Sequence, residues 1–306
     1  MKLLQYLAPL VLLVSTIDGR SNRKIDWSLV RPISEFPHVT RWIQNLLGNV
    51  TTANSHNNHS QRIVGGQVAS SDQIPYQAAI LADVEDGSGL CGGVLISANY
   101  VLTAAVCVHG ASEGTVILGA RNLQDENEDG QVRIDFTSSD YQVHEGYVEF
   151  IFRNNIAVIR LPSPVPVSSR IQPALLPAST DTRTFAGMLG TVSGFGRTSD
   201  GSTSFSDVLR YVYNPILTNA DCNAGWWGDL VDGQKMCLSN ASGRGPCVGD
   251  DGGPLTVQDA GQSLLVGFFS FGAVLGCEAN WPAVFVRVTF YLDWIQAHTD
   301  VVIRSG

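Results

Sequence analysis

Six cysteines are the side chains whose chemistry the sequence constrains most, and they are Cys91, Cys107, Cys222, Cys237, Cys247 and Cys277. Two reactions suit them: oxidation in pairs to disulfides and coordination of zinc through thiolates. Zinc sites often place two cysteines two residues apart, but this spacing does not occur here, and the histidines are not clustered with the cysteines. In an oxidising compartment the even count favours disulfides. Six cysteines allow fifteen pairings, so the count alone leaves the connectivity open.

The N-terminus indicates that the chain reaches such a compartment. Met1 and Lys2 are followed by an apolar run over residues 3–14, as in a secretory signal peptide. A membrane anchor is the alternative, but the run is shorter than the ~20 residues that span a bilayer. We therefore expect residues 1–19 to be a signal peptide, and the mature protein to be secreted, extracellular and without a membrane anchor.

Three asparagines precede a Ser or Thr by two positions: Asn49, Asn58 and Asn240. In a secreted chain each is a candidate for N-glycosylation.

The charges divide the chain in two. The full sequence has 19 basic and 28 acidic residues and a net charge of −9, but residues 1–62 carry +4 and residues 63–306 carry −13. An acidic chain with only 15% charged residues lacks the broad basic face that nucleic-acid binders use, so no nucleic-acid partner is expected. We expect the partners to be extracellular proteins that present basic surface, among them proteases or protease substrates.

Residues 20–62 differ in texture from the remainder and are predicted to form a pro-segment. Isolated apolar residues precede a short amphipathic helix that we expect over residues 39–47. A polar run over residues 51–60 cannot bury a core and ends close to Arg62. We therefore expect a protease of tryptic specificity to cut after Arg62.

From Ile63 onwards, short apolar runs alternate with turn residues. This pattern favours a β-barrel or a β-sandwich, and the clearest strand candidates are residues 93–96, 115–119, 156–161, 264–271 and 283–288. Residues 291–298 have helical spacing and are expected to form a C-terminal helix.

Five motifs follow one another along the chain: Arg62-Ile63-Val64-Gly65-Gly66, Cys91-Gly92-Gly93-Val94-Leu95-Ile96-Ser97, Val101-Leu102-Thr103-Ala104-Ala105-Val106-Cys107, Asn155-Ile156-Ala157-Val158-Ile159-Arg160-Leu161 and Gly249-Asp250-Asp251-Gly252-Gly253-Pro254. In their order and spacing, residues 63 to about 300 resemble the chymotrypsin-like serine proteases, and the sequence is most similar to the secreted brachyurin or chymotrypsin-like branch of insects. The resemblance implies an all-β domain over residues 63–306, with two six-stranded antiparallel β-barrels and a C-terminal α-helix. It also implies the disulfides Cys91–Cys107, Cys222–Cys237 and Cys247–Cys277.

The resemblance places Val106, Asn155 and Asp251 where active members carry the catalytic His, Asp and Ser. Valine has no atom that accepts a proton, and an asparagine cannot hold an imidazole in the tautomer that the reaction needs. Loss of one member of such a triad costs on the order of 10⁴–10⁶ in rate. We therefore expect a pseudo-protease that is not an enzyme and that acts through protein binding, as cofactor or decoy in an extracellular proteolytic cascade of immunity or haemostasis.

Two alternatives stay open. One is a secreted serine-type endopeptidase of chymotrypsin-like specificity with residual or atypical activity, in which His109, three residues after Val106, would be a displaced base. The other is a drifting paralogue without a selected role.

The resemblance also implies a processing switch. Cleavage between Arg62 and Ile63 would free an amino group that pairs with Asp250, because a buried ammonium and carboxylate offset each other's desolvation. The alternative is that the motifs around Arg62 and Asp250 are inherited packing constraints and do not form a switch. The backbone amides of Gly249 and Asp251 match the oxyanion hole, and we hypothesise that the Asp251 carboxylate occupies it or repels ligands from it.

The specificity pocket carried over by the resemblance consists of Gly245, Pro246, Gly272 and Ala283. It has no acidic residue at its base, so we expect an apolar pocket, narrowed by the methyl group of Ala283. The segment Ser270-Phe271-Gly272 is expected to pair with an extended peptide. No cofactor or metal is expected, and the acidic run over residues 125–129 is interpreted as a solvated turn.

Overall fold

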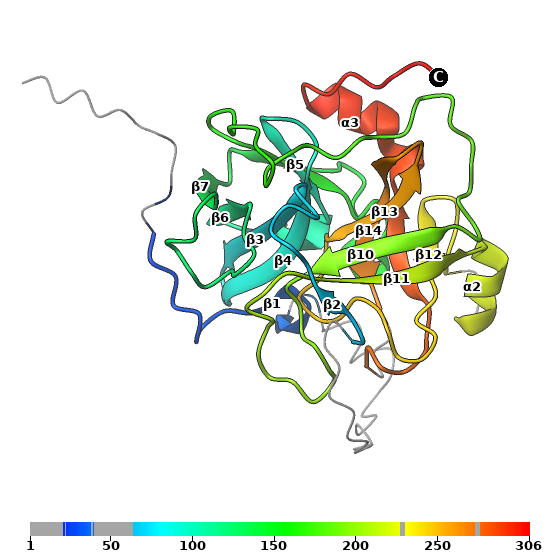
Figure 1. Cartoon of the computed structure of the whole chain (residues 1–306), viewed down its shortest axis with the longest axis horizontal. Coiled ribbons are helices and arrows are strands. Elements are labelled where there is room, and N and C mark those ends of the chain that lie inside the picture. The colour runs from blue at the N-terminus through cyan, green and yellow to red at the C-terminus, as the bar shows by residue number, and fades with distance from the viewer. Residues whose placement is uncertain (1–20, 22, 38, 40–63, 227–229, 273–275) are drawn as a thin grey trace, which may run out of the picture.

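Two β-barrels form the body of the molecule, and a short helix ends the chain against them (Figure 1). The computed structural model describes residues 21, 23–37, 39, 64–226, 230–272 and 276–306. The expected signal peptide, Asn49, Asn58, Arg62, Ile63 and nearly all of the predicted helix over residues 39–47 lie outside the described residues.

The first barrel is built from the N-terminal half of the domain. Its sheet runs in the order β7-β6-β3-β4-β5-β9-β8. The segment over residues 132–143 bends at a turn at residues 138–140, which divides it into β7 and β8. Because β7 pairs with β6 and β8 pairs with β9, this bent segment closes the ring. Counted with this bent segment as one strand, the barrel has the six strands that were expected. The bounds are β3 Gln77–Val84, β4 Gly87–Leu95, β5 Tyr100–Thr103, β6 Glu113–Leu118, β7 Val132–Thr137, β8 Tyr141–Val143 and β9 Ala157–Arg160.

The second barrel closes through a direct pairing of β10 with β11. Its order is β10-β13-β14-β15-β12-β11, and the two-residue strand β2, Gln67–Val68, adds to the outside of β11. The bounds are β10 Leu189–Gly194, β11 Arg210–Leu217, β12 Lys235–Leu238, β13 Pro254–Asp259, β14 Gln262–Phe271 and β15 Ala283–Arg287. The expected all-β fold with two barrels is therefore confirmed.

The strands form where the apolar runs predicted them. Each of the five candidate runs lies within or across one observed strand, because β-branched and aromatic residues pack well on a pleated surface. At the C-terminus a 3-10 helix, η4 Val288–Tyr291, leads into α3, Leu292–His298, which buries Leu292 and Ile295 against the barrels. A further α-helix, α2, spans Asn219–Gly225, and the Thr218 side chain accepts a hydrogen bond from the Asp221 N–H at its start.

Three disulfides have the connectivity that the resemblance implied. Cys91–Cys107 ties β4 to the 3-10 helix η2, Ala105–Cys107. Cys222–Cys237 joins α2 to β12, and Cys247–Cys277 joins two loops beside the second barrel. The Cα–Cα distances of 5.9, 6.1 and 5.2 Å are ordinary for disulfides. None of them reaches the segment before residue 62.

The described part of the predicted pro-segment packs on the first barrel. The blue segment in Figure 1 runs along this barrel to β1, Arg31–Pro32, which pairs in parallel with β4. The 3-10 helix η1, Ile33–Glu35, follows directly. The side chains of Ile33 and Phe36 have no exposed surface, and that of Val39 is 2% exposed. These apolar residues are therefore part of the core of the uncut chain.

Candidate functional site

The three residues that the resemblance singled out meet between the barrels. Val106 lies in η2, Asn155 precedes β9, and Asp251 lies in the turn before β13. The Val106 N–H donates to Asn155 Oδ1 at 3.0 Å, and Asn155 Nδ2 donates to the Ser270 hydroxyl at 2.9 Å. All three side chains are buried. The two hydrogen bonds fix the Asn155 amide with its oxygen toward Val106.

Asp251 is a buried carboxyl group held against backbone amides. Burial raises the pKa of Asp251 to about 6, whereas hydrogen bonds from the N–H groups of Gly249 and of Asp251 itself, and the neighbouring Ser34 hydroxyl, lower it. Its Oδ2 has no hydrogen-bond partner among the described residues. The carboxyl group therefore lies at the pair of amides that we hypothesised it to occupy.

Asp250, the preceding residue, is also buried and points the other way, into the second barrel. Its Oδ1 accepts from the Gly196 N–H at 2.7 Å and its Oδ2 from the Cys247 N–H at 2.9 Å. Burial raises the pKa of Asp250 to about 7, these two hydrogen bonds lower it, and the charge of Asp251 raises it. Gly196 makes the room, since a Cβ there would lie 2.6 Å from the carboxyl carbon.

A cleft of about 910 Å³ opens beside Asp251 and is lined mainly by apolar side chains. Among the described lining residues, Glu35 and Asp251 are the groups that ionise, and no histidine is present. His109 instead packs the edge of its ring against Tyr147. The described lining consists of Ser34, Glu35, Val39, Val106, Phe150, Ile151, Phe152, Trp226, Leu230, Asn240, Pro246, Cys247, Val248, Asp251, Phe269, Ser270, Phe271, Gly272, Gly276 and Cys277.

The structure corrects part of the expected specificity pocket. Pro246 and Gly272 line the cleft as expected. Ala283 is not among the described lining residues, and its side chain packs in the core of the second barrel. Gly245 lies against Asn240, and a Cβ at Gly245 would be 2.1 Å from Asn240 Oδ1. Asn240 is only 5% exposed, which argues against a glycan on its amide in the folded domain.

Three aromatic side chains form one wall of the cleft, and of these the sequence analysis singled out Phe271 but not Phe152 or Trp226. Phe152, after the 3-10 helix η3 Glu149–Ile151, stacks on Phe271 of β14 with ring centroids 5.1 Å apart. Trp226, which follows α2, meets the same ring edge-on at 5.6 Å. Phe152 and Trp226 lie in loops, Phe271 ends β14, and the three share no periodicity, so the sequence carried no signal that would bring them together.

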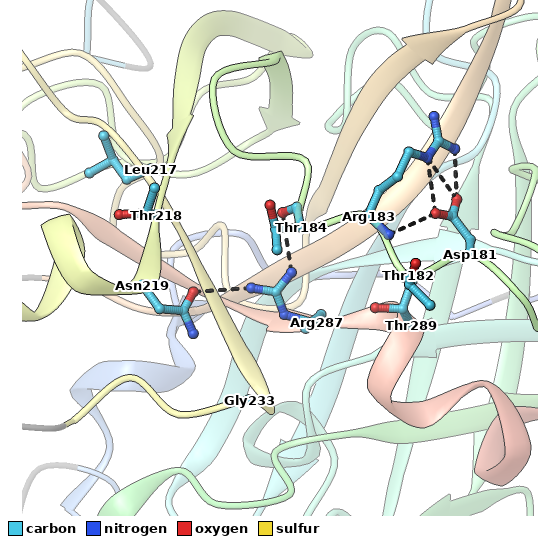
Figure 2. Close-up of a pocket in the computed structure, with 10 residues that line it drawn as sticks. All are labelled: Asp181, Thr182, Arg183, Thr184, Leu217, Thr218, Asn219, Gly233, Arg287 and Thr289. Atoms are coloured by element: carbon cyan, nitrogen blue, oxygen red, sulfur yellow. Dashed lines mark hydrogen bonds and ion pairs between the residues drawn. The ribbon is translucent and has the colours of Figure 1, made fainter.

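A second cavity, of about 430 Å³, lies beside β11 and β15, and its lining includes several charged side chains (Figure 2). Arg183 pairs with Asp181 and with Asp259 at 2.6 and 2.8 Å. Arg287 donates to the backbone carbonyl of Thr184 and to Asn219 Oδ1. Both guanidinium groups already have partners within the chain, so this cavity offers a ligand little charge.

The described residues offer one cluster with the spacing of metal ligands, Asp200 with Cys247 and Cys277. The two cysteines are bonded to each other in a disulfide, which removes the thiolates that a metal would need. In the part of the chain that the structure describes, no helix has both the length and the apolar character to cross a membrane.

Comparisons with known proteins agree with this architecture. The family model described as Trypsin matches residues 63–295. Brachyurin from Leptuca pugilator is 44% identical over 239 residues, which are 78% of this chain and 99% of that protein. Chymotrypsin from Phaedon cochleariae is 38% identical, over 79% of this chain and 83% of that protein. The solved structure of HL collagenase superposes with a TM-score of 0.69 at 32% identity, over 78% of this chain and all of that one.

These comparisons correct one expectation. From the residues at positions 106, 155 and 251 we expected that the chain is not an enzyme. Relatives that match over most of their length are named brachyurin, chymotrypsin and collagenase, which are active serine proteases, and this finding contradicts the expectation. Members of the family are generally secreted. The match over residues 63–295, the shared fold and the level of identity show that the chain belongs to the trypsin family of chymotrypsin-like serine proteases.

Proposed function

We propose that this protein acts outside the cell by binding an apolar stretch of polypeptide in the cleft between its barrels, as a component of an extracellular proteolytic cascade. The observation that carries the proposal is the cleft itself, a large and mainly apolar hollow whose aromatic wall is contributed by β14 and by loops of both barrels. Such hollows, with few polar groups, are the usual form of a binding site.

The edge of β14 supplies backbone groups for such a ligand. Pairing of β13 with β14 ends at Phe268, and Ser270, Phe271 and Gly272 then line the cleft. An extended peptide laid along this edge would gain main-chain hydrogen bonds, and its side chains would reach the aromatic wall. The Phe271 ring, held between Phe152 and Trp226, is the anchor for an apolar side chain of the ligand.

Hydrolysis of the bound peptide is the second candidate function, and the names of the relatives favour it. The described ionisable groups in the cleft are carboxyls, and the pKa of Asp251, raised by burial to about 6, lies close to neutral pH. A carboxyl group with such a pKa is suited to general acid–base catalysis. Atypical endopeptidase activity would therefore depend on Asp251.

Processing after Arg62 is part of the proposal. The released domain would carry about −13, which favours partners with basic surface. Asp250 is buried, and its described hydrogen bonds all come from backbone N–H groups. Burial raises the pKa of Asp250 to about 7. A new amino terminus brought beside it would lower this pKa and favour the ionised carboxylate. The pair would then order the turn that carries Asp251.

Trp226→Ala tests the cleft against a displayed library of random peptides. We expect peptides selected on the Arg62-cut chain to bind the W226A variant at least about 10-fold more weakly, because the variant loses one of the two rings that hold the Phe271 anchor. Leu189, 57% exposed and outside the cleft lining, provides the control L189A, which should bind as the wild type does. Affinities are measured by fluorescence anisotropy at two salt concentrations, and basic peptides should weaken as salt rises.

The same peptides decide between the two functions. Mass spectrometry of each peptide after long incubation shows whether it is cut. Cleavage products that vanish in Asp251→Asn would support the second candidate, whereas binding without products supports the first. Equal affinity of wild type and W226A for every selected peptide would contradict a role of the cleft in either function.

A further inference from the structure

The N-terminal segment sits in a socket that glycine creates on β4. Ile33 and Phe36 are both fully buried there. A Cβ at Gly89 would lie 2.6 Å from Ile33 Cδ1 and 3.2 Å from the Phe36 ring. Gly89 does not have a positive φ, so its backbone conformation does not require glycine. The missing side chain instead provides the space that the two apolar residues fill.

The segment also covers a sheet edge. Along Gly87–Val94 one side of β4 pairs with β3, and on the other side Arg31 and Pro32 pair in parallel with Gly89 and Leu90. A strand edge without a partner is a template for pairing with another chain. The segment therefore protects an edge that its departure would expose.

Polar contacts fix the register of the segment. Glu35 pairs with Arg197, which follows β10 of the second barrel, at 2.6 Å. The Arg31 guanidinium lies over the Phe36 ring, 4.4 Å from its centroid, and donates to the backbone carbonyl of Asp86. Arg23 pairs with Asp83 of β3. Arg197 therefore forms an ion pair with the acidic residue that directly precedes the aromatic residue, and this ion pair lies outside the apolar socket.

Nothing covalent holds the segment once the chain is cut. The sequence before residue 62 has no cysteine, and the three disulfides lie within the domain. In the uncut chain the tether gives the segment a high effective concentration at the socket, and cleavage removes this advantage. Ser34, Glu35 and Val39 line the cleft, so departure of the segment also widens it.

We propose that the Gly89 socket, with the β4 edge and Arg197, is an exchangeable docking site for a segment of another extracellular polypeptide that forms a short strand followed by a 3-10 turn, as residues 31–36 do. The recognised pattern is an aliphatic residue three positions before an aromatic one, with an acidic residue directly before the aromatic, as in Ile33, Glu35 and Phe36. Residues 31–36 occupy the site before cleavage, and the partner segment occupies it afterwards. The proposal rests on the proposed function in one respect, since the docked partner continues into the cleft.

A labelled synthetic peptide of residues 21–39 tests the exchange. Fluorescence anisotropy should show that it binds the Arg62-cut full chain, and binds the uncut chain at least about 100-fold more weakly. In the peptide, Phe36→Ala should weaken binding at least about 100-fold, because a fully buried ring is lost. Leu29→Ala is the matched control and should change nothing, since Leu29 is 67% exposed.

The domain side is tested with Gly89→Ala, whose methyl group meets Ile33 and Phe36; it should weaken binding about 10-fold. Unlabelled peptides with the aliphatic-x-acidic-aromatic pattern should compete with the probe, and the same peptides with the aromatic residue replaced by Ser should not. Equal binding to cut and uncut chains, or of the F36A peptide and its parent, would overturn the socket. Competition by the segment's own sequence alone would overturn exchange with a partner.

These outcomes are separate from those of the proposed function. Trp226 is not among the described contacts of the segment, so the W226A variant should bind the labelled peptide as the wild type does. Loss of library binding in the cleft with intact binding of the probe would contradict the proposed function and leave the socket in place. The peptide variants do not depend on the folding of a mutant domain.

Discussion

Peptide hydrolysis should rise on the order of 10³-fold or more when Val106→His, Asn155→Asp and Asp251→Ser are combined in the Arg62-cut chain. The site is already arranged to receive these groups. Asn155 Oδ1 accepts the Val106 N–H, and its amide contacts Ser270, so an aspartate at 155 would be placed beside an imidazole at 106. Loss of the Asp251 carboxylate would free the amides of residues 249 and 251 to bind an oxyanion.

The rate is measured with an apolar peptide substrate, and a fluorophosphonate probe should label the triple variant. Asp251→Ser alone is the control, and it should gain little because no base would activate its hydroxyl. Circular dichroism checks that each variant keeps the fold. A wild type that already cuts the substrate as fast as the triple variant would contradict the assignment of these positions, and so would a folded triple variant without gain.

The free energy of unfolding should fall as pH rises from about 4 to about 7, and Asp251→Asn should remove part of this fall. The pKa of Asp251 is about 6 in the folded chain and near 3.8 in the unfolded one, so the folded state binds the proton more tightly. The stabilisation from this proton is fully present below pH 3.8 and is lost as pH rises through 6. For two pKa units this amounts to about 2–3 kcal/mol.

We therefore expect D251N to be more stable than the wild type by about 2–3 kcal/mol at pH 7.5 and to show little difference at pH 4. Guanidinium unfolding with intact disulfides measures both values. The free energy of unfolding of D251N should still fall as pH rises to about 7, because burial raises the pKa of Asp250 to about 7. Asp129→Asn, at an exposed position, is the control and should follow the wild-type curve. A D251N variant that parallels the wild type at both pH values would contradict the buried position of this carboxyl.

Much of the scaffold followed from the sequence because it depends on local patterns. Apolar runs such as residues 264–271 predicted strands, and the family resemblance carried by the motifs around Cys91 and Asp251 implied the two barrels and the disulfides. The position of the Asp251 carboxyl at the amides of residues 249 and 251 was also foreseen. It depends on a short turn whose geometry the motif defines.

The aromatic wall and the socket could not be predicted, because each depends on contacts between distant segments. Phe152 stacks on Phe271 across the two barrels although Phe152 lies in no pattern that marks it, and the expected strand around Phe271 does not predict this partner. Ile33 and Phe36 read as isolated apolar residues of a pro-segment, and their burial depends on the missing side chain of Gly89.

The most direct test of polypeptide binding in the cleft is the dissociation constant of one library-selected peptide for the Arg62-cut chain and its Phe271→Ala variant. Phe271 contacts both Phe152 and Trp226, so its loss should dismantle the aromatic wall. We predict a dissociation constant at least about 30-fold higher for F271A, with L189A unchanged. An F271A variant that is folded and binds the peptide as tightly as the wild type would contradict the proposed function.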